Sequence, residues 1–268
     1  QERVIIREKP GIAPQLTANH LLHKSVFMEL SDLGLPLVKL KEIPVIVNLD
    51  EEHAEAYQAF HRELYNTCRD MQQELGTAAW SRFNPATLNY ADQPHLGQEV
   101  EFRNKDGSLL TAVSAPAFSK DYFTSKEEKL VELVQKELAE DRGCLIFTNY
   151  TGFYQTNERI QKVLHRHGIS SEILDTKTTP LKRFEWLEEQ ERKGTKVLIM
   201  NMSLVQVGLD IINWPTIIYW QLNDDINTIR QSSRRGWRLG QSRECRVYFL
   251  VSEGTQQFNQ FRRLMNRR

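Results

Sequence analysis

The chain has 268 residues, of which 26% are charged and 40% hydrophobic, and its formal net charge is zero. This length and composition are typical of a globular protein with a substantial core and exclude a disordered chain. With no apolar run long enough for a membrane span, no visible signal peptide and only three scattered cysteines, we expect no membrane partner and an intracellular location, in a bacterial cytoplasm or a nucleus.

The positive charge is concentrated at the C-terminal end. Residues 229–268 contain ten arginines and two glutamates, a net charge of +8, so the preceding 228 residues carry −8. Such an asymmetry favours a polyanionic partner. For the last eight residues, a solvated arginine-rich tail without a ligand is the alternative.

Residues 1–124 are predicted to form a helical or irregular extension. The run at 43–49, "IPVIVNL", is typical of a strand, and residues 51–76 indicate a long helix. Between 77 and 124 we expect a helical insertion with loops. The string "VIVNLDEEH" resembles a magnesium-binding DExH motif, but no phosphate-binding loop precedes it, and Asp50 followed by two glutamates is a favourable helix start.

From about residue 125 onward, short apolar runs alternate with helical stretches. This spacing predicts parallel βαβ crossovers and a three-layer α/β domain over residues 125–268, in which a parallel sheet is flanked by helices. Helices are expected at 154–168 and 180–194. The predicted strands are 143–149, 171–174, 195–200, 216–220 and 246–251.

Three polar loops adjoin these strands. "FTNYTG" follows the first strand of this region, "NMSLVQVGLDI" follows the third, and "QSSRRGWRLGQ" precedes the last. Ligands of such sheets bind at the carboxyl ends of the strands, so we expect the loops to share one rim. Helical spacing would place Gln231, Arg235 and Arg238 on a single face that meets either water or an anion.

These residues resemble the motifs of the second RecA-like lobe of superfamily-two helicases and translocases, most closely the Swi/Snf-type branch. The sixth motif of that family has the form Gln-x-x-x-Arg-x-x-Arg-x-Gly-Gln. Its fixed positions are matched by Gln231, Arg235, Arg238, Gly240 and Gln241. The fifth motif matches Gly208 and Asp210, and the fourth matches Phe147 to Asn149.

The resemblance implies a RecA-like parallel sheet flanked by helices over residues 125–268, and a role for each matching residue. Arg235 and Arg238 would be the catalytic arginines that contact the phosphates of ATP, where a charged guanidinium stabilises the transferred phosphoryl group. Nucleotide contacts are implied for Gln231, Gly208 and Asp210. Contacts to a nucleic-acid backbone, DNA or RNA, are implied for Thr148, Asn149, Asn201 and Ser203. The Ser-Thr and Gly-Gly pairs usual before the fifth motif are replaced by Asn201–Met202 and Val205–Gln206.

The nucleotide cradle itself has no counterpart in the sequence. A phosphate-binding loop requires a glycine followed by lysine, and none of the 13 glycines is followed by lysine. The resemblance therefore implies that ATP and Mg²⁺ are bound mainly by an N-terminal RecA-like lobe of the same protein. We expect this chain alone to be inactive and to be the C-terminal lobe of a motor.

Two other functions are weighed against a motor lobe. The first is a non-catalytic nucleic-acid-binding module with a helicase-lobe fold, against which the intact arginine pair argues. The second is an enzyme for a phosphorylated small molecule, which lacks a nucleophile–base pair here. No metal site is predicted, since His165 and His167 are only two residues apart. The tryptophans are mostly core candidates, although Trp237 could face a partner lobe or solvent.

Overall fold

The structure is a computed structural model that describes residues 14–26, 34, 38–152, 154–205, 209 and 211–266. It divides into two compact units, residues 1–37 and 38–268. The described part of the first unit forms three short helical turns: α1 (Pro14–Leu16), η1 (Thr17–Leu21) and η2 (Leu22–Lys24). Among the described residues, none of the helices has the length and apolar character that a bilayer crossing would need.

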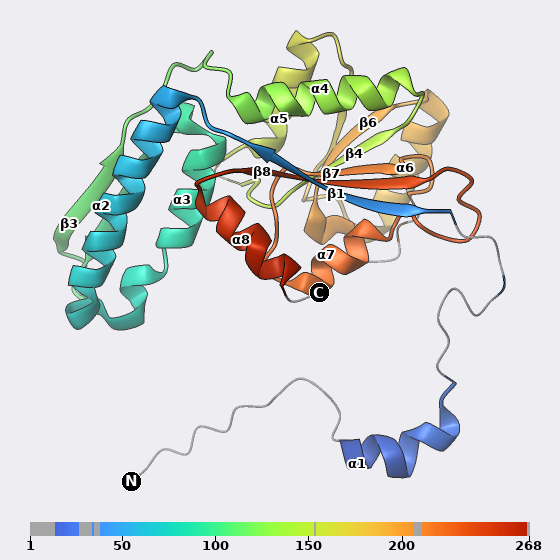
Figure 1. Cartoon of the computed structure of the whole chain (residues 1–268), viewed down its shortest axis with the longest axis horizontal. Coiled ribbons are helices and arrows are strands. Elements are labelled where there is room, and N and C mark those ends of the chain that lie inside the picture. Colours follow the sequence, from blue (N-terminus) through green and yellow to red (C-terminus); the bar gives the residue numbers. More distant parts are fainter. Residues whose placement is uncertain are drawn as a thin grey trace. The chain divides into compact units, whose positions relative to one another are not determined.

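The second unit is built on a six-stranded sheet with the order β1-β8-β7-β4-β6-β5 (Figure 1). Every neighbouring pair in this sheet is parallel. The strands are β1 (Leu40–Val47), β4 (Cys144–Thr148), β5 (Glu172–Leu174), β6 (Val197–Asn201), β7 (Thr216–Tyr219) and β8 (Cys245–Ser252). The predicted RecA-like parallel α/β architecture is confirmed, and all six predicted strands are present.

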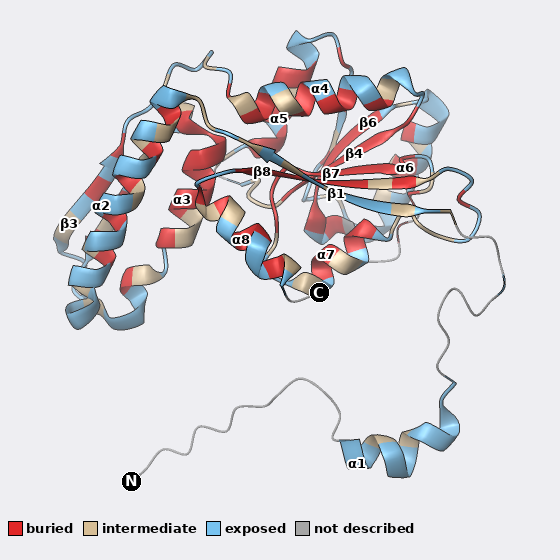
Figure 2. Cartoon of the chain, viewed as in Figure 1, coloured by how far each residue is buried: buried red, intermediate tan, exposed pale blue. Residues whose placement is uncertain are grey.

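Helices cover both faces of the sheet, which explains why its central strands are continuous apolar runs. On one face lie α4 (Ser125–Ala139) and α5 (Thr156–Arg166), and on the other lie α6 (Pro180–Lys193), α7 (Ile226–Ser233) and α8 (Gln256–Met265). Alternation along a strand divides its side chains between the two cores: Ile146 packs toward α4 and α5, and Phe147 packs toward α7 and α8. Figure 2 shows the buried strands between exposed outer helix surfaces.

A separate small core lies between β1 and α4 in the chain. It is formed by α2 (Glu51–Leu75), η4 (Gly76–Trp80), α3 (Phe83–Asp92) and an antiparallel hairpin of β2 (Gln98–Arg103) and β3 (Leu109–Ala115), with the short turn η5 (Pro94–Leu96) between α3 and β2. We call residues 51–115 the inserted segment. The hairpin differs from the predicted helical insertion with loops. Val100, Phe102 and Val113 are buried in this hairpin, but its strands are short, and their alternation is too brief to be recognised as a periodic pattern in the sequence.

The predicted division at residue 125 does not coincide with a boundary of the sheet. β1 pairs with β8 over eight residues, from Leu40–Cys245 to Val47–Ser252, so the sheet begins about 85 residues upstream of α4. Residues 38–268 form one compact unit. The inserted segment interrupts the connection from β1 to α4, which is why the first strand appeared in the sequence to belong to a different region.

Two further predictions concern the ends of helices. Asp50 is the N-cap of α2, and its side chain accepts a hydrogen bond from the His53 amide, so the interpretation of "DEEH" as a helix start is confirmed. Of the last eight residues, those up to 266 form the end of α8 and its C-cap, and whether their arginines meet a ligand stays a prediction. Helix α8 buries Phe261 and Leu264 against the sheet while its arginines, Arg262 and Arg263, face outward.

Candidate functional site

The loop that follows α7, residues 234–241, carries the two arginines singled out in the sequence. Helix α7 ends at Ser233, so Arg235 and Arg238 lie beyond it, and the prediction of one helical face shared with Gln231 is wrong. Two serines contribute to this early end, because the hydroxyls of Ser232 and Ser233 bond back to carbonyls of the preceding turn. We call residues 234–241 the arginine loop.

Three side-chain and backbone features fix the arginine loop against the sheet. The indole Nε1 of Trp237 donates to the Val38 carbonyl oxygen at 2.7 Å, so this half-buried residue packs within its own chain. Nε2 of the buried Gln241 donates to the carbonyl oxygens of Ile212 (2.9 Å) and Gly236 (3.0 Å). Gly240 has a φ of 92°, a conformation that favours glycine. The loop is therefore held at the amino edge of the sheet.

The chemistry of the arginine loop suits an anion. Arg235 and Arg238 are both half-buried, and Gln231 is exposed on the last turn of α7. Guanidinium and amide N–H groups donate hydrogen bonds in planar pairs, which fits phosphate oxygens and does not fit a metal ion. Within the described ranges, no group of three or more His, Cys, Asp or Glu side chains could hold a metal ion.

A second polar cluster lies at the carboxyl ends of β4 and β6. Nδ2 of Asn201 donates to the Asn149 carbonyl oxygen at 2.8 Å, and its Oδ1 accepts from both the amide and the hydroxyl of Ser203, at 2.9 and 2.7 Å. The structure thus brings together three of the residues predicted to contact nucleic acid. Ser203 is exposed and Asn149 is half-buried, whereas Asn201 is only 7% exposed.

Thr148 has no exposed side-chain surface with which to make its predicted contact to nucleic acid. The residue is fully buried, and its hydroxyl donates to Oδ1 of Asn157 at 2.7 Å, with the Met200 carbonyl oxygen at 3.2 Å. It therefore joins the end of β4 to α5 and β6. The side-chain amide of Asn201 likewise donates and accepts hydrogen bonds within the chain. Asn201 therefore fixes the loops after β4 and β6, and Asn149 and Ser203 are the residues of these loops that reach the surface.

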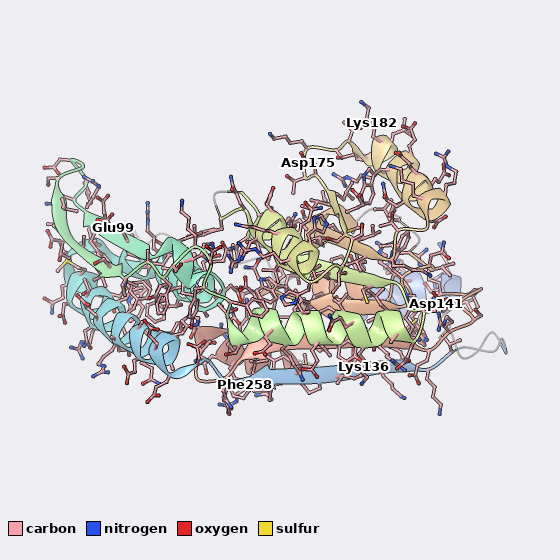
Figure 3. All side chains as sticks on the ribbon, turned by 90° about the horizontal axis from the view of Figure 1, so that it is seen from above. Glu99, Lys136, Asp141, Asp175, Lys182 and Phe258 are labelled. Carbon is pink, nitrogen blue, oxygen red and sulfur yellow. The ribbon has the colours of Figure 1, made fainter. Side chains whose placement is uncertain are left out.

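The two clusters lie at opposite edges of the sheet, so the prediction of one shared rim is wrong. In a parallel sheet, a loop that precedes a strand lies at the amino edge and a loop that follows one lies at the carboxyl edge. The arginine loop precedes β8, while Asn149 and Ser203 follow β4 and β6. In Figure 3, Asp141, before β4, marks the amino-edge end of the molecule, and Glu99 of the hairpin lies at the other end.

The fifth-motif residues Gly208 and Asp210 lie outside the described residues. Leu209 between them is described and is 1% exposed, packed in the core on the α7 and α8 side of the sheet.

The structure adds Gln221, a residue that the sequence did not single out. Its Oε1 accepts hydrogen bonds from the backbone amides of Asn149 (3.0 Å) and Tyr150 (2.9 Å), and its Nε2 donates to Oδ2 of Asp92 at 2.9 Å. Gln221 thus connects the loop after β4 to the inserted segment. The only signal in the sequence was a polar residue directly after an apolar strand.

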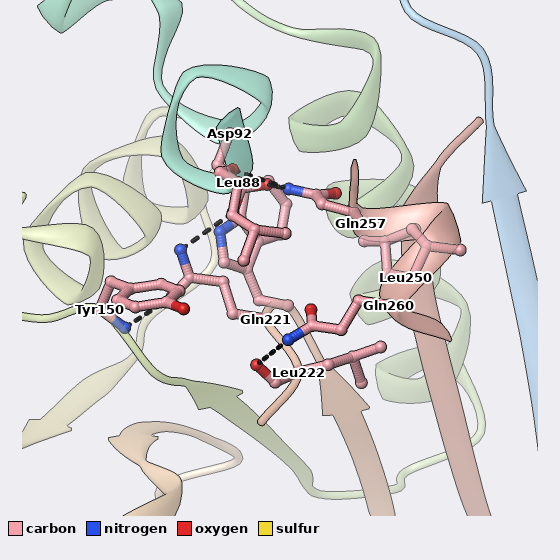
Figure 4. A pocket seen from close by; sticks show the side chains of 10 residues that line it. Leu88, Asp92, Tyr150, Gln221, Leu222, Leu250, Gln257 and Gln260 are labelled. Carbon is pink, nitrogen blue, oxygen red and sulfur yellow. Dashed lines mark hydrogen bonds between the residues drawn. The ribbon is translucent and has the colours of Figure 1, made fainter. Parts of the chain in front are cut away.

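Asp92 is itself part of a buried ionic cluster. Its Oδ1 lies 2.7 Å from Nζ of Lys126 and also accepts from Nε2 of Gln257 at 2.7 Å. Burial lowers the pKa of Lys126, and the charge of Asp92 acts in the opposite direction. Figure 4 shows Asp92, Gln221 and Gln257 converging beside a small cavity of about 10 Å³, whose lining also includes Tyr150.

Residues 125–240 match the family described as the helicase conserved C-terminal domain. The chain is 26% identical over 165 residues to the human DNA repair and recombination protein RAD54B, which covers 57% of this chain and 18% of that protein. It is 27% identical over 131 residues to a putative ATP-dependent helicase/translocase, YwqA, of Bacillus subtilis, covering 48% and 14%. The chain therefore spans less than a fifth of the length of these relatives.

Two solved structures share the fold. The C-terminal part of the Fun30 ATPase domain superposes with a TM-score of 0.64 at 14% identity, covering 85% of this chain and 89% of that one. The Sulfolobus solfataricus SWI2/SNF2 ATPase core, solved in complex with double-stranded DNA, gives a TM-score of 0.58 at 18% identity, covering 85% and 44%. At these identities the likeness establishes the fold.

Proposed function

We propose that the chain is the C-terminal RecA-like lobe of a Swi/Snf-type helicase or translocase and is thus one half of an ATP-driven DNA motor. In this role it completes an ATP site with its arginine loop and contacts the DNA backbone with its carboxyl edge. The observation that carries the proposal is the separation of these two clusters. A motor must couple two ligands, and this lobe has the arginine loop at one edge of its sheet and the polar cluster of Asn149 and Ser203 at the other.

The arginine loop supplies the catalytic part. ATP hydrolysis develops charge on the oxygens of the transferred phosphoryl group, and a guanidinium there contributes about 10³–10⁵ in rate. Trp237 and Gln241 fix the loop that carries Arg235 and Arg238, because their side chains donate to the carbonyl oxygens of Val38 and Ile212. Gln231, Gly208 and Asp210 are assigned to the nucleotide side with the two arginines.

The partner of this loop is an N-terminal RecA-like lobe of the same protein. That lobe would bind ATP and Mg²⁺ through a phosphate-binding loop, which the sequence of this chain lacks, and this chain alone would not hydrolyse ATP. The short coverage of the relatives' length supports such a partner. A DNA motor of this kind would act in the bacterial cytoplasm or the nucleus.

We assign the contacts to nucleic acid to Asn149 and Ser203, and Asn201 bonds to both of the loops that carry them. Amide and hydroxyl groups at a strand end can donate to phosphate oxygens without reading sequence. The basic C-terminal segment adds long-range attraction for a polyanion. That the SWI2/SNF2 core of Sulfolobus solfataricus was solved with double-stranded DNA favours DNA as the ligand.

The test is the ATP turnover of a two-lobe protein that contains this chain, measured with DNA present. Arg238→Ala should lower turnover by about 10³-fold or more, and Arg238→Lys should recover little of it, because lysine cannot form the paired hydrogen bonds of a guanidinium. The matched control is Arg262→Ala, which removes an exposed arginine of α8.

Near-normal turnover of the Arg238→Ala protein would remove the catalytic role. Turnover in this chain alone, above background and proportional to its concentration, would overturn the requirement for a second lobe. If the two-lobe protein binds DNA but never hydrolyses ATP, the non-catalytic binding module becomes the better reading.

A further inference from the structure

Two hydrogen-bond chains run from the end of α3 to the loop after β4. Both begin at neighbouring residues, Asp92 and Gln93, at the end of α3 in the inserted segment. The first ends on the backbone amides of Asn149 and Tyr150, and the second ends on the backbone carbonyl oxygen of Tyr150. The residues at the start and end of these chains are more than fifty positions apart in the sequence, so the contacts are features of the folded unit.

The first chain passes through Gln221. Oδ2 of Asp92 accepts from Nε2 of Gln221 at 2.9 Å, and Oε1 of Gln221 accepts from the amides of Asn149 and Tyr150. Asp92 is 1% exposed and Gln221 is 6% exposed. The primary amide of Gln221 therefore acts as a relay, with its donor side on the inserted segment and its acceptor side on the loop.

The second chain passes through Thr156, the first residue of α5. Nε2 of Gln93 donates to the hydroxyl of Thr156 at 2.8 Å, and that hydroxyl donates in turn to the carbonyl oxygen of Tyr150. Gln93 and Thr156 are each 1% exposed. The amide and the carbonyl of Tyr150 are thus held from two directions by side chains that α3 positions.

We propose that α3 sets the position of the loop at Asn149 and Tyr150, with Asp92, Gln93, Gln221 and Thr156 as positioning residues. The inserted segment then regulates the DNA-contacting edge of the lobe, because a shift of α3 moves or releases the loop that presents Asn149. The regulatory half of this inference rests on the proposed function; the positioning half does not.

A buried polar cluster of this kind needs a reason beyond stability. Well-packed apolar side chains of similar volume are often as stabilising as a buried ion pair, whereas polar groups fix one geometry. Here the fixed element is the backbone of one loop. The cluster also includes Lys126, which bonds the Trp220 carbonyl oxygen at 2.8 Å and so ties α4 to the same point.

The experiment exchanges the two partners of the first chain. Asp92→Asn leaves Lys126 without its buried counter-charge, and Gln221→Glu sets two carboxylates against each other. In the double variant D92N/Q221E, the amide of the new asparagine can donate to the carboxylate of the new glutamate. That carboxylate can still accept from the backbone amides of Asn149 and Tyr150, and the net charge of the cluster is unchanged. Amide hydrogen exchange at Asn149 and Tyr150 is measured in the whole chain without DNA, with the β6 amides as the internal reference.

We expect each single variant to speed exchange at the two loop amides by about tenfold, while β6 changes little, and the double variant to restore most of the protection. The affinity for a labelled 20-base-pair DNA duplex, measured by fluorescence anisotropy, should fall and recover in parallel. Unchanged loop exchange in folded single variants would overturn the positioning role.

A second pair keeps the test informative if the charge variants do not fold. Thr156→Val removes the hydroxyl of the second chain at nearly constant volume, and Thr156→Ser retains it. Valine should speed exchange at the end of this loop and serine should not; equal exchange in both would overturn the second chain. If loop exchange responds in either set but DNA affinity stays constant, the positioning role stands and the DNA contact assigned to Asn149 fails.

Discussion

Nζ of Lys126 lies 2.7 Å from Oδ1 of Asp92, and each side chain is 1% exposed. The pair joins the first turn of α4 to the last residue of α3, so an ionic bond in the interior connects the inserted segment to the sheet. The Nζ atom also lies 4.5 Å from the centre of the Trp220 ring. A charge so enclosed depends on its partner, because water cannot replace it.

Lys126→Met should therefore lower the free energy of unfolding strongly, by about 3–5 kcal/mol, since it leaves the Asp92 carboxylate buried without a counter-charge. Adding Asp92→Asn should recover part of the loss. Urea denaturation followed by circular dichroism measures both. The control is Lys129→Met on the same helix, whose exposed pair with Glu132 should contribute about 1 kcal/mol or less. Equal losses for the two lysines would contradict the argument.

A second buried carboxylate predicts how stability depends on pH. Glu137 accepts hydrogen bonds from Thr216 (2.6 Å), Tyr248 (2.7 Å) and Arg246 (2.9 Å). Burial opposes its ionisation, but these hydrogen bonds outweigh burial and hold the pKa of Glu137 below its ordinary value of 4.5. As the pH is lowered, Glu137 is therefore protonated at a lower pH in the folded protein than in the unfolded chain.

Its stabilising contribution is complete above about pH 4.5 and is lost as the pH falls through the lower folded-state pKa, by at most about 1.4 kcal/mol per pH unit. Glu137→Gln should destabilise the protein at pH 7, because Arg142 loses its buried partner, and should flatten the acid limb of the stability curve. Unfolding free energies at several pH values between 7 and 3 test this. The control is Glu188→Gln at an exposed position, which should leave the acid-side fall of the unfolding free energy as steep as in the parent. The same steepness in Glu137→Gln would refute the contribution assigned to Glu137.

The regular elements could be predicted from the sequence because they depend on local pattern. Central strands such as Cys144–Thr148 are apolar runs buried on both faces, and α6 begins at Pro180 and ends before Gly194, which adopts a left-handed conformation. The hairpin of the inserted segment was missed, since its strands are short and its pairing depends on contacts with α2 and α3.

The candidate site residues could be singled out by type, and their roles stay predictions, but their arrangement could not be predicted. The arginines were found from their spacing, yet the end of α7 at Ser233 and the opposite placement of the two clusters depend on strand direction and order. Gln221 could not be found, because Asp92 is 129 positions away in the sequence and a glutamine after a strand is usually solvated. Thr148 was misread for the same reason: its burial depends on Asn157 and Met200.

Ser203 offers a test of the nucleic-acid side through charge. Ser203→Glu places a carboxylate on the exposed carboxyl edge, and we expect it to weaken duplex DNA binding about tenfold at low salt and less as salt screens the repulsion. For the parent chain, the logarithm of affinity should fall by about 0.9 per phosphate contacted for each log unit of salt. Ser170→Glu, at the exposed amino edge before β5, is the matched control. Equal effects of the two glutamates would place the DNA elsewhere.

Trp237 offers a test of whether the geometry of the arginine loop affects ATP turnover. Its indole Nε1 bonds the Val38 carbonyl oxygen just before β1, so Trp237→Phe keeps most of the packing and removes this one anchor. In a two-lobe protein we expect ATP turnover to fall several-fold at saturating ATP while the melting temperature changes little, because a loosened loop misplaces Arg235 and Arg238 during the reaction. Trp186→Phe, a half-buried tryptophan of α6 that packs against the core, controls for the loss of an indole. Normal turnover in the Trp237→Phe protein would contradict this role of the indole anchor, and a large fall in melting temperature would assign Trp237 to the stability of the sheet edge.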